Sequence, residues 1–304
     1  MTPASIVLFV YNRPWHTRQT VEALQKNDLA QESELFIYSD GPKNEASAQS
    51  VREVRDYVGT IGGFKKVTVI QREKNLGLAA NIIDGVSRCV NLYGRVIVLE
   101  DDLVTSPKFL TFMNAALARY EGTKEVWHIS GWNYPIYNEM RHETFLWKKM
   151  NCWGWATWSD RWAHFEKNPS ELMQRFTPER ITEFDLDGMD NNWNQVVGNF
   201  KKRIDTWAVF WHATIFRHDG LCLNPYTSFV TNIGHDGSGV HCGRSFGKDI
   251  EILNDAERYL FPADIVEDTA NRERVKKRIR LKQSVPVRAL GRLVRALTGG
   301  HTAK

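Results

Sequence analysis

The strongest constraint on the fold is the alternation of short apolar runs with amphipathic stretches over the first hundred residues. β-Branched and aliphatic runs predict strands at Ile6–Tyr11, Leu35–Ser39, Lys66–Gln71 and Arg95–Leu99, and the stretches between them have the period of helices. Repeated strand–helix–strand units build a largely parallel sheet, so an α/β fold is expected. Because ligands bind beyond the carboxyl ends of such strands, the residues after each strand are the functional candidates.

Three consecutive acids, Glu100, Asp101 and Asp102, directly follow an aliphatic strand. Adjacent carboxylates beside an apolar core repel one another unless a cation or hydrogen-bond donors compensate them. Mn²⁺ or Mg²⁺ does this with oxygen ligands and keeps positions for substrate phosphates. The sequence therefore predicts a divalent metal site that binds a diphosphate. The alternative is a solvated acidic turn, or a helix N-terminal cap before Ser106.

The distribution of charge separates a mildly acidic body from a basic C-terminal segment. Residues 272–304 carry eleven Lys or Arg and one acid, whereas residues 1–271 carry 29 basic and 35 acidic side chains. An acidic body argues against a nucleic acid as partner. The four cysteines form no CxxC pair, and neither a P-loop nor a GxGxxG motif occurs. A zinc site, a disulfide framework, and kinase-like or dinucleotide-binding functions are therefore not expected.

The order of these motifs resembles the GT-A-fold glycosyltransferases, and in particular N-acetylglucosaminyltransferase I and its bacterial relatives. The resemblance covers about residues 5–243 and implies a Rossmann-like, mostly parallel central sheet flanked by helices. It also implies inverting transfer from a UDP-sugar with Mn²⁺ or Mg²⁺ as cofactor. The matching segments are Val7–Arg13, Phe36–Gly41, Val96–Leu103 with Pro107–Phe109, Ile129–Asn133 and Cys152–Trp155.

The resemblance implies a set of donor-site residues. It places Arg13 and Asp40 against the uracil, Glu100 and Asp101 near the ribose and sugar, and Asp102 as the direct metal ligand. A guanidinium and a carboxylate can read the imide edge of uracil, while a metal neutralises the leaving diphosphate.

Two further residues, Arg72 and Asn75, resemble a nucleotide-side element of broader GT-A enzymes. From the residues alone, Arg13 is equally compatible with a surface ion pair. Asp40 likewise suits a plain turn.

Inverting transfer needs one carboxylate to take the proton of the acceptor hydroxyl. The resemblance points to Asp205, because the family places its base in an Asp-x-Trp element, here followed by residues 220–225. Asp185, Asp187 and Asp190 are nearby rivals, and Asp205 could instead cap the following helix.

Seven of the eleven tryptophans lie between Trp127 and Trp162. Aromatic rings stack on the apolar faces of sugars, so Trp132 and Trp155, with Asn133, are expected to line the donor and acceptor cleft. Core packing is the alternative. The Gly- and His-rich segment at residues 232–241 is expected to be a lid, with His241 touching the diphosphate or the metal.

The chain is expected to divide into a GT-A domain at residues 1–266 and a tail at 267–304. Residues 1–105 form the nucleotide-binding half of that domain and residues 106–266 the acceptor-binding half. Leu290, Leu293, Val294 and Leu297 share one helical face, opposite Arg288, Arg292 and Arg295. A basic amphipathic helix of this kind suits an anionic membrane surface, although it could instead pack on the body.

Together these features predict an inverting, metal-dependent glycosyltransferase that moves a sugar from a UDP-sugar to a saccharide or lipid-linked glycan in surface polysaccharide synthesis. No signal peptide or spanning run is recognised, so the expected location is cytoplasmic, peripheral at the inner face of the plasma membrane. The alternatives are a sugar-1-phosphate nucleotidyltransferase and an inactive, membrane-associated glycan-binding relative.

Overall fold

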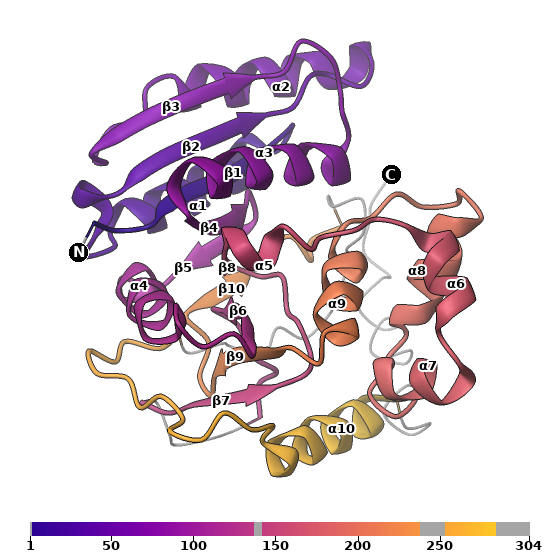
Figure 1. The fold of residues 1–304 in the computed structure, drawn as a ribbon. Coiled ribbons are helices and arrows are strands. Elements are labelled where there is room, and N and C mark those ends of the chain that lie inside the picture. The colour runs from indigo at the N-terminus through magenta and orange to yellow at the C-terminus, as the bar shows by residue number, and fades with distance from the viewer. Residues whose placement is uncertain (1, 137–141, 238–252, 284–304) are drawn as a thin grey trace, which may run out of the picture.

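The computed structural model describes residues 2–136, 142–237 and 253–283, and its centre is an eight-stranded sheet (Figure 1). The strand order is β3-β2-β1-β4-β8-β6-β9-β7, and β5 and β10 form a separate antiparallel pair. The strands of the large sheet are β1 (Ser5–Val10), β2 (Glu34–Ser39), β3 (Lys66–Gln71), β4 (Arg95–Glu100), β6 (Val126–Ser130), β7 (Thr144–Trp147), β8 (Trp155–Trp158) and β9 (Leu221–Pro225); the small pair is β5 (Leu103–Thr105) and β10 (Val230–Asn232).

The first four strands are parallel, and their register brings their carboxyl ends to one edge. Val10 pairs with Ser39, Ser39 with Gln71, and Phe9 with Glu100. The second half of the sheet is mixed, because β8 runs antiparallel to both β4 and β6. The expected α/β architecture with a mostly parallel sheet is confirmed.

Helices cover both faces of the sheet because alternate residues of each strand point to opposite sides. Ile6, Leu8 and Val10 pack against α1, α2 and α4, whereas Val7 and Phe9 pack against α3. A short 3₁₀ helix, η1, occupies Ala30–Glu32, and the α-helices are α1 (Pro14–Gln25), α2 (Glu45–Val58), α3 (Leu78–Tyr93), α4 (Phe109–Tyr120), α5 (Ser159–Trp162), α6 (Pro169–Arg175), α7 (Pro178–Phe184), α8 (Asn192–Phe200), α9 (Ala208–Arg217) and α10 (Thr269–Gln283).

A third core lies beside the sheet, where α6, α7, α8 and α9 pack together. Its centre consists of the buried side chains of Leu172, Phe184, Val196, Phe210 and Phe216. Figure 1 shows this helical cluster set to the side of the sheet, on the acceptor half of the chain. The second half of the chain therefore has a helical core of its own, rich in buried aromatic rings, in addition to the core around the sheet.

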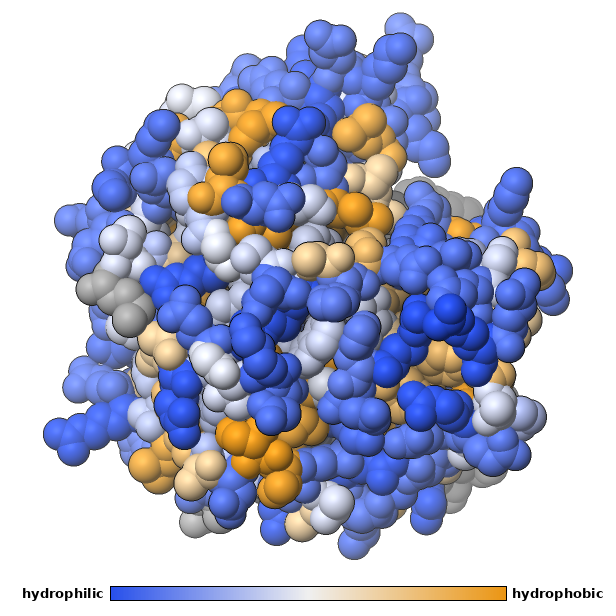
Figure 2. Space-filling model, viewed as in Figure 1, coloured by the Kyte–Doolittle hydropathy of each residue, from blue (hydrophilic) through white to orange (hydrophobic). Residues whose placement is uncertain are grey.

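The described part of the expected tail packs on the body. Helix α10 lies across the acceptor half (Figure 1), and Val275 on it is fully buried. Residues 284–304, which include the amphipathic stretch predicted at 287–297, lie outside the described residues. No helix among the described residues is long and apolar enough to cross a membrane. Figure 2 shows a mostly hydrophilic face on which apolar side chains form separate small patches.

Candidate functional site

The acid triplet lies at the carboxyl edge of the sheet, where β4 turns into β5. Asp101 and Asp102 are only 4% and 6% exposed. Arg13, which follows β1, donates from Nη2 to Asp101 and, at 2.9 Å, to Oδ2 of Asp102. The alternative of a solvated acidic turn is therefore wrong, because the two aspartates face an arginine inside the protein.

One guanidinium compensates three carboxyl groups incompletely. Burial, followed by repulsion from Asp102 and Asp101, raises the pKa of Glu100 to about 8. Burial also raises the pKa of Asp101, although Arg13 opposes that shift. Burial alone would lower the pKa of Arg13, but the two aspartates outweigh it and raise that pKa. The site thus has an excess of negative charge that a divalent cation would relieve.

The ligand set around Asp102 is small. Within the described residues, no three His, Cys, Asp or Glu side chains converge on one point as a metal cage would require. A site with one or two carboxylates suits Mg²⁺ or Mn²⁺, because these ions keep positions for water and phosphate oxygens. The residues present therefore fit a metal that is completed by the substrate.

The segment after β10 crosses directly over Asp102. The Ile233 amide donates to the Asp102 carbonyl at 2.9 Å, and a Cβ on Gly234 would lie 2.2 Å from Oδ2 of Asp102. Nε2 of His16 lies 3.1 Å from Asp236, and the ring of His235 lies 5.5 Å from that of Trp153. Residues 233–236 therefore cover the acids at the place where a lid was expected. His241 lies outside the described residues.

Asp40 anchors a neighbouring loop. Its carboxylate accepts hydrogen bonds from the amides of Gly41, Leu76 and Gly77 and from Nδ2 of Asn75, all at 2.9–3.1 Å. Asp40 and Asn75, which the sequence proposed separately as nucleotide-side residues, therefore contact each other directly. The four bonds show that Asp40 shapes the loop at the sheet edge, and contact with uracil remains a prediction.

Arg72 points towards helix α3. It donates from Nε to Asn81 at 3.0 Å, pairs with Asp84, and lies 5.0 Å from the centre of the Tyr38 ring. These contacts tie the end of β3 to α3. The structure therefore does not bring Arg72 together with Arg13 and the acid triplet.

An aromatic cleft of ≈ 380 Å³ opens on the acceptor half. Trp132 and Trp153 meet edge to face in its wall, with ring centres 4.6 Å apart. Asn151 Nδ2 and both ring nitrogens of His212 are buried along this cleft and have no hydrogen-bond partner among the described residues, and the same holds for Oδ1 of Asn133. Since buried polar atoms normally bond to protein, water or ligand, these atoms suit a ligand rich in hydroxyl groups.

Asp190 supplies the carboxylate of this cleft. Nζ of Lys149, which is itself buried, donates to Oδ2 of Asp190 at 2.5 Å, and the Asn191 amide donates to Oδ1 at 2.8 Å. Burial alone would raise the pKa of Asp190, but Lys149 lowers it to about 2. Asp190 is therefore ionised at neutral pH. No motif in the sequence marks Lys149, so the pairing was not predicted.

Asp205, the predicted base, lies elsewhere. Its side chain is 66% exposed and pairs with Lys167, in a hollow of ≈ 460 Å³ also lined by Lys202 and Arg203. No residue lining this hollow also lines the aromatic cleft. Of the rivals, Asp185 accepts the Trp193 amide at 2.9 Å, and Asp187 pairs with Arg272 and Lys276. Of these four aspartates, Asp190 is the one that lines the aromatic cleft.

Trp155 requires a correction, because it does not line the cleft. It sits in the central strand β8 with 1% of its surface exposed. Its ring centre lies 5.2 Å from that of Trp207, 5.6 Å from that of Trp162 and 5.4 Å from that of His128. A side chain enclosed by three rings belongs to the core, as do all four residues of β8, which are buried on both faces of the sheet.

Comparison with known proteins now gives the family. The profile described as "Glycosyl transferase family 2" matches residues 5–169. The chain belongs to glycosyl transferase family 2. This confirms the resemblance to GT-A glycosyltransferases, shows that the protein is a glycosyltransferase, and leaves the nucleotidyltransferase alternative without support. The matched segment runs from β1 to the start of α6, so it includes Arg13, the acid triplet and the tryptophan-rich region.

Solved structures that match the chain include TarS residues 1–349 of S. aureus, at 10% identity and a TM-score of 0.43, over 74% of this chain and 59% of that one. Another is the mannosyltransferase PcManGT from Pyrobaculum calidifontis, solved with GDP-Man and Mn2+, at 9% identity and a TM-score of 0.40, over 72% and 70% of the chains. The chain thus spans about three fifths of the TarS fragment. No curated protein matches the sequence.

Proposed function

We propose that this family 2 enzyme is an inverting, divalent-metal-dependent glycosyltransferase that uses a UDP-sugar donor and a saccharide or lipid-linked glycan acceptor in surface polysaccharide synthesis. The observation that carries the proposal is one continuous segment. Residues 233–236 cover Asp102 through Gly234 and reach the aromatic cleft through His235 and Trp153. A diphosphate at the acids and a sugar in the cleft would therefore be neighbours.

In this proposal Asp102, with Asp101 beside it, would hold Mn²⁺ or Mg²⁺. The metal supplies positive charge that stabilises the leaving diphosphate. Arg13 holds the two aspartates in place through its two hydrogen bonds. Asp40 and Asn75 shape the loop at the nucleotide side, and Glu100 lies in the same acidic edge. These assignments to the donor follow the resemblance and the arrangement at the carboxyl edge.

The acceptor step assigns the base to Asp190. Its ionised carboxylate takes the proton of an acceptor hydroxyl while that oxygen forms a bond to the anomeric carbon. The bond from that carbon to the diphosphate oxygen breaks, and the electron pair leaves with the diphosphate. Attack opposite the leaving group inverts the anomeric configuration, and a single carboxylate suffices. Trp132 and Trp153 offer apolar faces on which sugar rings stack.

The site assignment is tested by calorimetry with UDP in the presence and absence of Mn²⁺. We expect binding that requires the metal and is lost in Asp102→Ala, because the diphosphate then lacks its bridging cation. The exposed Asp264→Ala variant is the matched control and should bind as the wild type does. Equal binding without metal would refute the assignment. A hydrolysis screen over purified sugar nucleotides then identifies the donor.

The location of the enzyme is a separate part of the proposal. Helix α10 exposes Arg274, Lys277 and Arg280 to solvent, and this basic side suits the anionic inner leaflet, where a lipid-linked acceptor would lie. Sedimentation with vesicles of phosphatidylglycerol, against vesicles of neutral lipid, tests it. Binding that is independent of lipid charge would contradict this part without affecting the reaction assigned above.

A further inference from the structure

Two cations of helix α10 contact one carboxylate of the body, that of Asp187. Nη2 of Arg272 donates to Oδ1 of Asp187 at 2.7 Å, and Nζ of Lys276 donates to Oδ2 at 2.7 Å. Arg272 and Lys276 are four residues apart, so they lie on the same face of the helix, about one turn from each other. The fully buried Val275 packs beside them. Two cations of this basic helix therefore form ion pairs within the protein.

Asp187 belongs to an unusual turn. Leu186, Asp187 and Gly188 have φ angles of 53°, 56° and 74°, so three successive residues adopt the left-handed conformation. That conformation is unfavourable for a residue such as leucine, and it persists only where the surroundings enforce it. Here the Gly188 amide donates to the Thr182 carbonyl at 3.1 Å.

The turn ends on the proposed base. The Asp190 amide donates to the Asp185 carbonyl at 2.8 Å, which closes the loop that began with α7. Residues 185–188 thus position the backbone of Asp190, and the hydrogen bond from Lys149 orients its side chain. A shift of the turn would move the carboxylate relative to the cleft.

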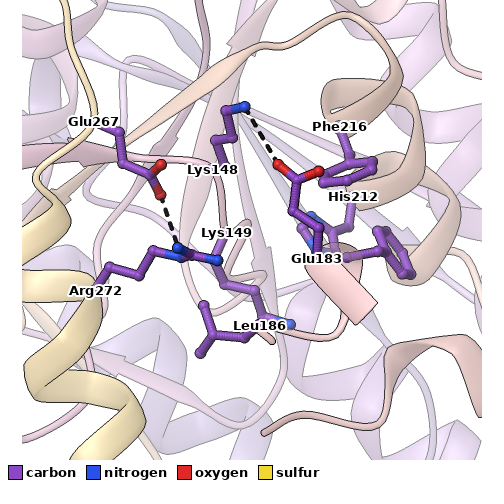
Figure 3. A pocket seen from close by; sticks show the side chains of 9 residues that line it. Lys148, Lys149, Glu183, Leu186, His212, Phe216, Glu267 and Arg272 are labelled. Atoms are coloured by element: carbon purple, nitrogen blue, oxygen red, sulfur yellow. Dashed lines mark ion pairs between the residues drawn. The ribbon is translucent and has the colours of Figure 1, made fainter. Parts of the chain in front are cut away.

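A small cavity of ≈ 40 Å³ lies between the turn that precedes Asp190 and Lys149, and both Leu186 of that turn and Lys149 line it. Figure 3 shows Arg272 extending from α10 towards Leu186 and Lys149, and pairing with Glu267. His212 lines both this cavity and the aromatic cleft. Helix α10 therefore borders the back of the acceptor site.

From this arrangement we propose that α10 is part of the catalytic apparatus, in which Arg272 and Lys276 act through Asp187 as positioning residues for Asp190. The inference rests on the proposed role of Asp190 as base. It assigns to the first turns of α10 a function that differs from membrane attachment. The tail predicted at residues 267–304 would then contribute to turnover through its first half.

The test is Asp187→Asn, because asparagine tolerates the left-handed conformation while losing the charge that both cations contact. We expect kcat to fall about tenfold, since a displaced catalytic group is costly even when it is chemically intact. KM for the donor and metal-dependent UDP binding should not change. The double variant Arg272→Gln/Lys276→Gln should show the same loss, and adding Asp187→Asn to it should cost nothing more.

Two controls make the outcome decisive. Lys201→Gln removes an exposed cation at the C-terminal end of α8, away from Asp187, and should keep the full kcat. Exchanging the cations, as Arg272→Lys/Lys276→Arg, keeps both charges and should restore most of the activity. A lower melting temperature of Asp187→Asn with unchanged kcat would overturn the proposal. If Asp190→Asn is fully active, the assignment of the base fails instead, so the two failures are distinguishable.

Discussion

The two halves of the molecule build their parts of the site in different ways. In the first half, residues 1–105, parallel strands end in register, so Arg13, Asp40 and the last residue of β4, Glu100, lie at one edge. In the second half, strands of both directions, a buried aromatic core and helix α10 determine where the cleft lies. In the first half, a residue's position at the end of a strand therefore indicates that it belongs to the site. In the second half, sequence position gives no such indication.

The largest expected effect distinguishes Asp190 from Asp205 as the proposed base. Asp190→Asn should lower kcat by about 10²–10⁴-fold, because it removes the group that accepts the proton. Asp205→Asn, which changes an exposed side chain paired with Lys167, should leave kcat nearly unchanged. Rates of transfer and UDP affinity, measured together, check both. Loss of turnover in Asp205→Asn alone would return the base to the position that the sequence favoured.

The next effect separates core tryptophans from cleft tryptophans. Trp155→Ala should lower the free energy of unfolding by about 3–5 kcal/mol, because it empties a fully enclosed site. Trp132→Ala changes a half-buried ring and should cost only about 1 kcal/mol, but it should raise KM for the sugar substrate. Denaturant melts and steady-state kinetics of the two variants decide. Similar stability losses would contradict the distinction.

A smaller effect concerns pH and the core of the acceptor half. Burial lowers the pKa of His128 from 6.5 to about 3, where Trp211 donates to Nδ1 at 3.2 Å and Nε2 contacts the Asn151 carbonyl at 2.9 Å. The unfolded chain binds a proton below its ordinary pKa while the folded protein does not. The stabilisation is therefore complete above that pKa and declines as the pH falls.

Between about pH 6.5 and about pH 5, His128 should reduce the free energy of unfolding by about 2 kcal/mol. Urea melts across this range measure the slope. His128→Gln keeps hydrogen-bonding groups but does not titrate, so its free energy of unfolding should fall by about 2 kcal/mol less than that of the wild type over this pH range. An unchanged slope would show that His128 is not the group responsible.

The smallest expected effect concerns the segment that joins the halves. Gly234→Ala would place a Cβ 2.2 Å from Asp102 Oδ2, so residues 233–236 must move away from the acids. UDP affinity should fall about tenfold, equivalent to about 1.4 kcal/mol. Gly62→Ala is the matched control, because a Cβ there has nothing within 4 Å. Calorimetry that finds both variants equal would disconnect this segment from the donor site.

Sequence reasoning found the acid triplet, its arginine and the loop partner of Asp40, because each follows a strand of a parallel sheet. It also found the aromatic wall at Trp132. It placed Trp155 in that wall as well, because residue type alone does not show that both faces of β8 are covered by the core. Arg72 was grouped with the nucleotide residues by resemblance to a GT-A element, whereas in the structure it contacts Asn81 and Asp84 of α3.

By itself, the sequence determined the parallel sheet, the acidic carboxyl edge and, through the resemblance of its motifs, a GT-A-fold glycosyltransferase. These are local properties, since alternation and strand ends depend on residues close together in the chain. Only the tertiary structure paired Lys149 with Asp190, 41 residues apart, and Arg272 with Asp187, 85 residues apart. The physical reason is that an ion pair forms wherever packing brings opposite charges together, and packing between distant segments leaves no periodic signal in the chain.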